Sequence, residues 1–184
     1  EHWQLSLSAK LLAIALTGGA ATVLGFYLRH KNALFAVALQ GVGLAIIFLT
    51  LVFAHHFEVI DELMTASLCF AVLLLITIAL SLFQNALYLS ILALSMAYLA
   101  PLLIPQYHPE SVFLLSYYLV INLAVAAINF VKPWKLLHQL AFVATGLIAG
   151  SYISIYAKPE QYAVLDQILW LHIGLFIWLS IRYS

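Results

Sequence analysis

Residues 34–54 read LFAVALQGVGLAIIFLTLVFA, a run of 21 residues without a charged side chain. A helix needs about 20 apolar residues to cross the roughly 30 Å hydrocarbon core of a bilayer, so this stretch is long enough to span a membrane. Because the run is continuously apolar and does not alternate, it predicts a helix and not a strand of a membrane barrel. The run also contains Gln40, Gly41 and Gly43, whose role depends on what surrounds the helix.

The composition of the whole chain has the same excess of apolar residues. Of 184 residues, 66% are hydrophobic and 8% are charged, and the mean hydropathy is +1.10. A soluble domain has about 25% charged residues, and so few charges cannot form a polar shell. We therefore predict an integral membrane protein whose excess apolar surface contacts the lipid bilayer. The net charge of zero argues against a nucleic-acid partner.

Six further runs have the length of membrane spans or nearly so, and short polar segments separate them. Connections this short make consecutive helices antiparallel neighbours. We expect an all-α, polytopic transmembrane bundle of about seven spans that forms a single domain over residues 1–184. Since the chain starts at Glu1 and ends directly after an apolar run, we also expect it to be part of a longer protein. The predicted spans are Leu5–Leu28, Leu34–Ala54, Leu63–Phe83, Ala86–Ile104, Ser111–Val131, Leu136–Tyr156 and Tyr162–Ile181.

The distribution of basic residues predicts the orientation. Cytoplasmic loops carry an excess of lysine and arginine, and five of the seven basic residues fall on one set of alternate ends. This places the N-terminus of the segment outside and its C-terminus in the cytoplasm. A weak repeat supports an origin from duplicated helical hairpins, because similar four-residue motifs open the second, fourth and sixth predicted helices. The five basic residues are Arg29, Lys31, Lys132, Lys135 and Arg182, against Lys10 and Lys158.

The glycines in the apolar runs are best interpreted as packing positions. A phosphate-binding Gly-x-Gly turn needs a strand before it and a helix after it, and residues 41–43 lie inside one helix. In lipid, small residues allow two helix backbones to approach closely. The predicted packing residues are Gly41, Gly43 and Ala45 in the second span, Gly146 and Gly150 in the sixth, and Gly18, on the same face as Gly25, in the first.

Polar residues inside the spans are candidates for function, because burying them in lipid is costly. Gln40, Asn122 and His172 need hydrogen-bond partners, and we expect bonds between helices ahead of a substrate or proton-relay role. Pro101 removes a backbone hydrogen bond, which predicts either a kink that opens a cavity or, as we favour, an early end of the fourth helix. No carboxylate lies at the predicted midplane, which argues against a proton- or sodium-coupling site.

The polar stretch at residues 55–62, HHFEVIDE, is the best candidate for a metal site. His55, His56 and Glu58 are residue types that zinc or manganese accept. Adjacent histidines, however, lack the spacing of three or four that places ligands on one helix face. No nucleophile–base pair or nucleotide motif is present elsewhere, so the sequence favours a protein that is not an enzyme and uses no cofactor.

Three stretches are similar to a known family. Residues 33–50, ALFAVALQGVGLAIIFLT, resemble the ALALQGxGLAxLYLT stretch of the bacterial family called domain of unknown function 2339. Residues 98–103 and 118–123, the latter followed by the basic aromatic turn at residues 132–135, resemble it as well. The resemblance implies a long protein of the bacterial inner membrane with many spans, and it implies no activity or catalytic residue.

The residues favour a membrane scaffold or assembly subunit linked to the cell envelope, with other membrane-protein segments or subunits as partners. Packing stripes, short loops and few central polar groups support this interpretation. The alternative is a transporter or lipid-handling protein with a mid-membrane cavity near Pro101, Asn122 and His172. An intramembrane enzyme that uses the histidine and glutamate cluster at residues 55–58 is the third class.

Overall fold

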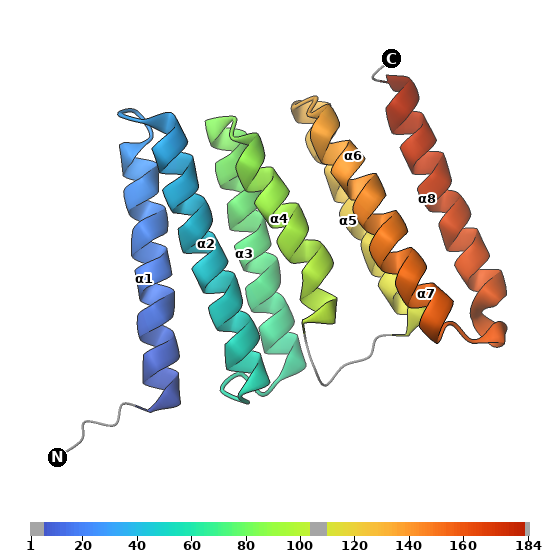
Figure 1. Ribbon diagram of the computed structural model, residues 1–184, viewed down its shortest axis with the longest axis horizontal. Coiled ribbons are helices and arrows are strands. Elements are labelled where there is room, and N and C mark those ends of the chain that lie inside the picture. The colour runs from blue at the N-terminus through green and yellow to red at the C-terminus, as the bar shows by residue number, and fades with distance from the viewer. Residues whose placement is uncertain (1–5, 104–109, 183–184) are drawn as a thin grey trace. The chain divides into compact units, whose positions relative to one another are not determined.

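The structure, a computed structural model, describes residues 6–103 and 110–182, and these ranges are helical apart from short connections (Figure 1). The chain divides into two compact units, residues 1–105 and 106–184. The first unit contains α1 (Leu7–Leu28), α2 (Ala33–His56), α3 (Leu63–Gln84) and α4 (Leu87–Leu99). The second contains α5 (Ser111–Val131), α6 (Lys135–Ala144), α7 (Gly150–Tyr156) and α8 (Tyr162–Arg182).

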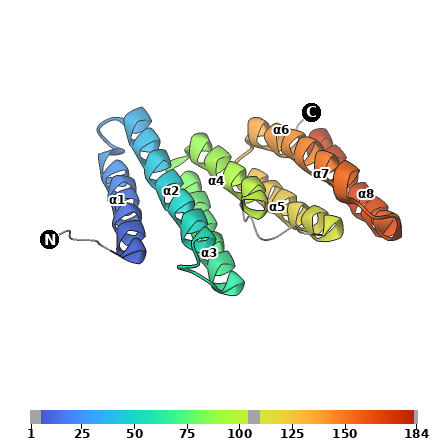
Figure 2. The same ribbon diagram turned by 60° about the horizontal axis from the view of Figure 1, so that its bottom comes forward.

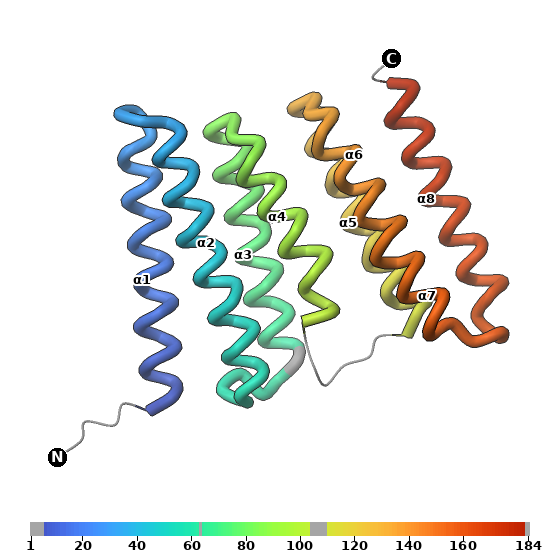
Figure 3. Tube along the Cα trace, viewed as in Figure 1, coloured from blue at the N-terminus to red at the C-terminus, as the bar shows by residue number. Residues whose placement is uncertain are grey.

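Within residues 6–103 and 110–182, six helical segments are long and apolar enough to cross a membrane. One of them, Lys135–Tyr156, combines α6 and α7 through the π-helical turn Thr145–Ala149, and Figure 3 traces it as one continuous rod. The described residues contain no strand, which confirms the predicted all-α membrane bundle. The helix ends lie within a few residues of those predicted, while the predicted termini Leu5 and Ile104 lie outside the described residues.

The fourth apolar segment, Leu87–Leu102, is shorter than the other six. α4 ends at Leu99, and a 3₁₀ turn follows over Ala100–Leu102. Proline lacks a backbone N–H and disfavours a helical conformation of the residue before it, so Pro101 accounts for the end of the α-helix here. The Leu103 N–H closes the turn on the Leu99 carbonyl at 3.0 Å.

Local capping explains where other helices begin and end. The Ser6 hydroxyl accepts a hydrogen bond from the Ala9 N–H, and Asn32 Oδ1 accepts one from the Phe35 N–H at 3.1 Å. Both bonds satisfy N–H groups that a helix start leaves open. α3 ends at Gln84, and the capping residue Asn85 has a left-handed φ of 54°, a conformation that asparagine tolerates better than most residues.

Each unit buries only part of its apolar surface. In the first unit, α2, α3 and α4 share a core in which the rings of Phe48 and Phe70 meet edge to face, 5.5 Å between centroids. In the second unit, Leu114 and Tyr118 of α5 and Leu137 of α6 are almost fully buried. Only 17–39% of each of the six long spans is buried, and the remaining surface is mostly apolar, as lipid contact requires.

Candidate functional site

The motif Gln40-Gly41-Val42-Gly43 lies where α2 packs against α1 (Figures 1 and 2). A Cβ atom added at Gly43 would overlap the Gly18 carbonyl oxygen and Thr22 Oγ1 and lie 2.7 Å from the Thr22 nitrogen. A Cβ at Gly18 would likewise lie 2.7 Å from the Gly43 carbonyl oxygen. The two backbones therefore approach too closely for any larger residue.

Gly25 extends the same contact toward the α1–α2 connection. A Cβ atom there would lie 2.7 Å from both the Ala36 carbonyl oxygen and Gln40 Cγ. The glycine thus leaves room for the Gln40 side chain, which has no exposed surface. Gly41, in contrast, faces away from α1, since its nearest neighbour would be a side-chain carbon of Leu92 at 3.8 Å, and Ala45 packs beside the core of the first unit.

Gln40 and Gln84 form a reciprocal amide pair between α2 and α3. Gln40 Nε2 donates to Gln84 Oε1 at 3.0 Å, and Gln84 Nε2 donates to Gln40 Oε1 at 2.7 Å. Gln84 Nε2 also reaches the Leu80 carbonyl at 3.3 Å. Nearby, the Ser81 and Ser90 hydroxyls lie 2.5 Å apart and link α3 to α4. Polar side chains thus connect three helices of this unit near one end.

Asn122 and Thr145 make the corresponding contact in the second unit. Asn122 is 1% exposed, and its Nδ2 donates to Thr145 Oγ1 at 2.8 Å. Thr145 Oγ1 in turn donates to the Ala141 carbonyl at 2.8 Å, at the start of the π-helical turn. π-Helical turns interrupt the regular backbone pattern and occur frequently at functional sites. The sequence pattern did not predict this turn, although glycines lie at positions 146 and 150, in it and directly after it.

Gly146 and Gly150 have open surroundings. No heavy atom within 4 Å would meet a Cβ at either position. The two glycines expected to pack against a helix therefore make no close helix contact among the described residues, because their face of the sixth span points away from α5 and α8.

His172 is 2% exposed, and its Nδ1 lies 2.9 Å from the Ile168 carbonyl, which can only accept. Nδ1 therefore carries the proton and Nε2 is a buried acceptor. Gln40 and Pro101 belong to the first unit, whereas Asn122 and His172 belong to the second. The first-unit groove at Arg29 and the second-unit groove between α6 and α8 are not lined by Pro101, Asn122 or His172.

The proposed metal ligands do not converge among the described residues. His55 Nδ1 lies 2.9 Å from the Ile60 carbonyl, and the His56 ring packs edge to face against Phe57. Glu58 adopts a left-handed φ of 57°. The described part of the chain contains no group of three or more histidine, cysteine, aspartate or glutamate side chains that could hold a metal ion.

Two arginine sites were not identified from the sequence, where these residues served only to predict orientation. The Arg29 guanidinium lies 3.8 Å from the ring centroid of Phe26 and 5.8 Å from that of Phe83. In the second unit, Arg182 lies 3.8 Å from the Phe130 centroid. Such contacts are cation–π interactions. The sequence does show an arginine near an aromatic residue at a predicted helix end. It does not show that a ring from another helix also contacts the arginine.

Long apolar helices with mostly apolar outer surfaces define the molecule as a polytopic α-helical membrane protein. A family model described as predicted membrane protein (DUF2339) matches residues 1–184, and the chain belongs to this family. The resemblance seen in the sequence is thereby confirmed. No curated protein and no solved structure matches the chain.

Proposed function

We propose that this chain acts as a scaffold within a membrane assembly of the bacterial inner membrane, linked to the cell envelope, with its first helix starting outside. The observation that carries the proposal is the pairing of buried and half-buried polar side chains across helices. Gln40 bonds Gln84, and Asn122 bonds Thr145. Polar side chains that hydrogen-bond across a contact, amide to amide in the first pair and amide to hydroxyl in the second, hold neighbouring helices in register.

The Gly146 and Gly150 face is the surface that supports a role in assembly. Exposed glycines four apart on a membrane helix allow a second helix to approach closely. No described residue occupies the space that a Cβ at either position would fill. A transmembrane helix from elsewhere in the assembly is the partner that we assign to this face.

The test is native mass spectrometry of the intact protein released from its own membrane, comparing wild type with Gly146→Leu/Gly150→Leu. We expect discrete protein partners on the wild type and their loss from the double variant. Gly174→Leu is the matched control, since Gly174 on α8 is equally open and lies on another helix.

The proposal fails if the wild type carries no protein partner, or if the double variant and Gly174→Leu retain partners equally. Thermal unfolding followed by circular dichroism checks that the double variant is folded. Because neither glycine contacts another helix within the described chain, we expect the same melting temperature within about 2 °C.

A further inference from the structure

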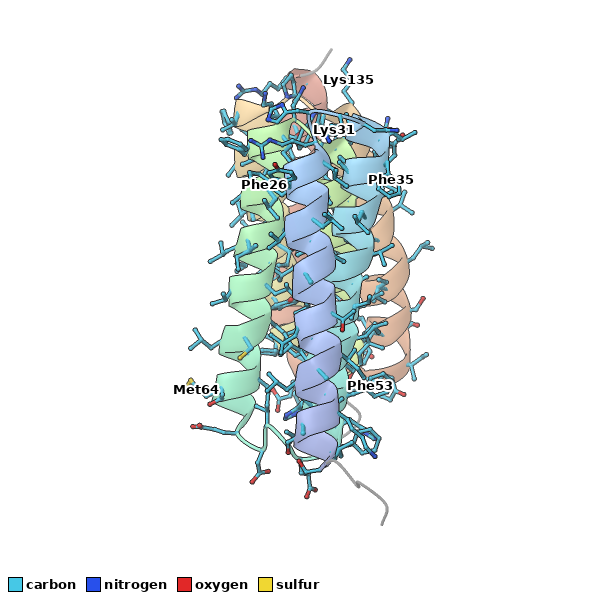
Figure 4. All side chains as sticks on the ribbon, turned by 90° about the vertical axis from the view of Figure 1, so that its left-hand side faces the viewer. Phe26, Lys31, Phe35, Phe53, Met64 and Lys135 are labelled. Carbon is cyan, nitrogen blue, oxygen red and sulfur yellow. The ribbon has the colours of Figure 1, made fainter. Side chains whose placement is uncertain are left out.

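A groove of about 350 Å³ opens at the end of the first unit where α1 is connected to α2 and α3 ends. Arg29, His30 and Gln84 provide its polar lining, and Ala33, Val37 and Phe83 provide its apolar lining. Phe26 and Lys31 lie at this end of the unit and Met64 lies toward the other (Figure 4). The groove therefore combines a basic mouth with apolar walls at a helix end that meets the membrane surface.

Arg29 is half-buried in this groove, and two contacts hold its side chain in place. Its Nη1 donates to the Phe26 carbonyl at 3.0 Å, and the guanidinium stacks on the Phe26 ring. The Phe26 and Phe83 rings lie 6.1 Å apart, so residues from α1 and α3 flank the guanidinium together. A guanidinium held in this way retains further N–H donors in the planar arrangement that suits a phosphate.

No carboxylate of the described first unit can neutralise Arg29. The acidic residues of that unit are Glu58, Asp61 and Glu62, which lie beyond the opposite end of α2. A helix of 24 residues is about 36 Å long, far beyond the reach of an ion pair. Lys31 adds a second positive charge at the same end.

The start of α2 gives the groove a second source of positive potential. The helix begins at Ala33, which lines the groove, and Asn32 Oδ1 accepts a hydrogen bond from the Phe35 N–H alone. The first N–H groups of a helix have no partner within it and favour an anion. A bound anion at this groove would thus face both a guanidinium and a helix N-terminus.

We propose that this groove binds the phosphodiester headgroup of an anionic phospholipid. The occupant is a membrane lipid because basic pockets at the ends of membrane helices are suited to anionic headgroups, and because the walls formed by Val37 and Phe83 continue toward the acyl region. The phosphate lies against Arg29, and the glycerol and first acyl carbons lie against Val37 and Phe83. This site is independent of the scaffold role proposed above.

The test uses the full-length protein purified in a neutral detergent and supplied with equal amounts of palmitoyl-oleoyl phosphatidylglycerol and phosphatidylcholine. Native mass spectrometry then counts the lipids retained. We expect one phosphatidylglycerol to be preferred about tenfold, which corresponds to about 1.4 kcal/mol. Arg29→Gln should abolish this preference. Lys31→Gln is the matched control, because Lys31 carries the same charge in the same connection but does not line the groove, and it should keep the preference within about twofold.

A second pair of variants tests the shape of the groove without changing any charge. Ala33→Trp should fill the groove and remove the retained lipid, whereas Leu34→Trp, at an adjacent position that is 75% exposed and outside the groove, should retain it. Both positions are on the surface, so the fold should persist, and circular dichroism verifies this.

Four outcomes would overturn the proposal. The first is a wild type without preference for phosphatidylglycerol. The second is an equal loss in Arg29→Gln and Lys31→Gln, which would indicate diffuse attraction to a basic connection. The third is lipid retained by Ala33→Trp. The fourth is displacement of the lipid by millimolar inorganic phosphate, or a protein chain in its place, since either would assign the groove to a different occupant.

Discussion

Replacing Gly43 with alanine should separate α1 from α2. The added Cβ would overlap Gly18 O and Thr22 Oγ1 and lie 2.7 Å from the Thr22 nitrogen. Two of these three atoms belong to the backbone of α1, so they cannot move as a flexible side chain can. An ordinary contact requires about 3.4 Å or more, so α1 would have to shift by roughly 1 Å.

The magnitude follows from two opposing effects. Overpacking against backbone costs about 3 kcal/mol, the upper end of the usual range. Alanine has a better helix propensity than glycine by about 1 kcal/mol. The expected net loss is therefore about 2 kcal/mol in the free energy of unfolding, or roughly a 30-fold change in the folding equilibrium.

The assay is unfolding by sodium dodecyl sulfate in mixed micelles, followed by far-ultraviolet circular dichroism. Gly19→Ala, on the other helix of this pair, is the matched control, since it is the same substitution and no atom within 4 Å would meet its Cβ. This control should be as stable as the wild type or more stable by up to about 1 kcal/mol. Equal midpoints for Gly43→Ala and Gly19→Ala would refute the close backbone contact.

A double variant sharpens the same test. Gly18 and Gly43 face each other across the contact. A shift of α1 caused by the first alanine should therefore make room for part of the methyl group of the second alanine. The combined loss for Gly18→Ala/Gly43→Ala should fall short of the sum of the single losses by about 1 kcal/mol or more. Strict additivity would mean that the two positions do not share one contact.

Three further predictions concern the polar contacts and one helix end, and the same unfolding assay tests them. Gln40→Leu should lower the free energy of unfolding by about 1–3 kcal/mol because the Gln84 amide loses its partner. The double variant Gln40→Leu/Gln84→Leu should recover most of this loss, and no recovery would argue against the pairing. Asn122→Leu should lower the free energy of unfolding by about 1 kcal/mol, and this loss should be smaller in a Thr145→Val background, whereas an unchanged loss would argue against the Asn122–Thr145 bond. Asn85→Ala should lower the free energy of unfolding by about 1 kcal/mol, because alanine is strained at the left-handed φ of 54° found there, whereas Asn85→Gly should not lower it. Equal losses in the two variants would exclude this strain.

The fold class could be predicted because a bilayer imposes a simple requirement. Every backbone group in lipid must be hydrogen-bonded internally, so a long apolar run becomes a helix whatever its neighbours are. Pro101 also has a local effect on the backbone, and α4 ends two residues before it. These features depend on one segment at a time, and one segment can be read directly from the sequence.

The arrangement of partners could not be predicted, because it depends on rotation about each helix axis. Gly41 and Gly43 lie two residues apart, which is about 200° around a helix, so they face different neighbours. Only the structure places Gly43 against α1 and Gly41 toward Leu92. The same limit applies to Gln84, whose partner Gln40 lies 44 residues away. Apolar sequence on all sides of a membrane helix gives no periodic signal that would set its rotation.

The two units use a similar solution for the basic residues at their helix ends. Arg29 stacks on Phe26 of its own helix and lies near Phe83 of α3, and Arg182 stacks on Phe130 of α5. An aromatic ring holds a guanidinium without neutralising it, whereas a carboxylate would cancel the charge. The positive charge from which the orientation was predicted is thereby not cancelled, and the ring contacts connect the end of one helix to another. The arginines that predicted the orientation therefore also contact an aromatic ring of a second helix in each unit.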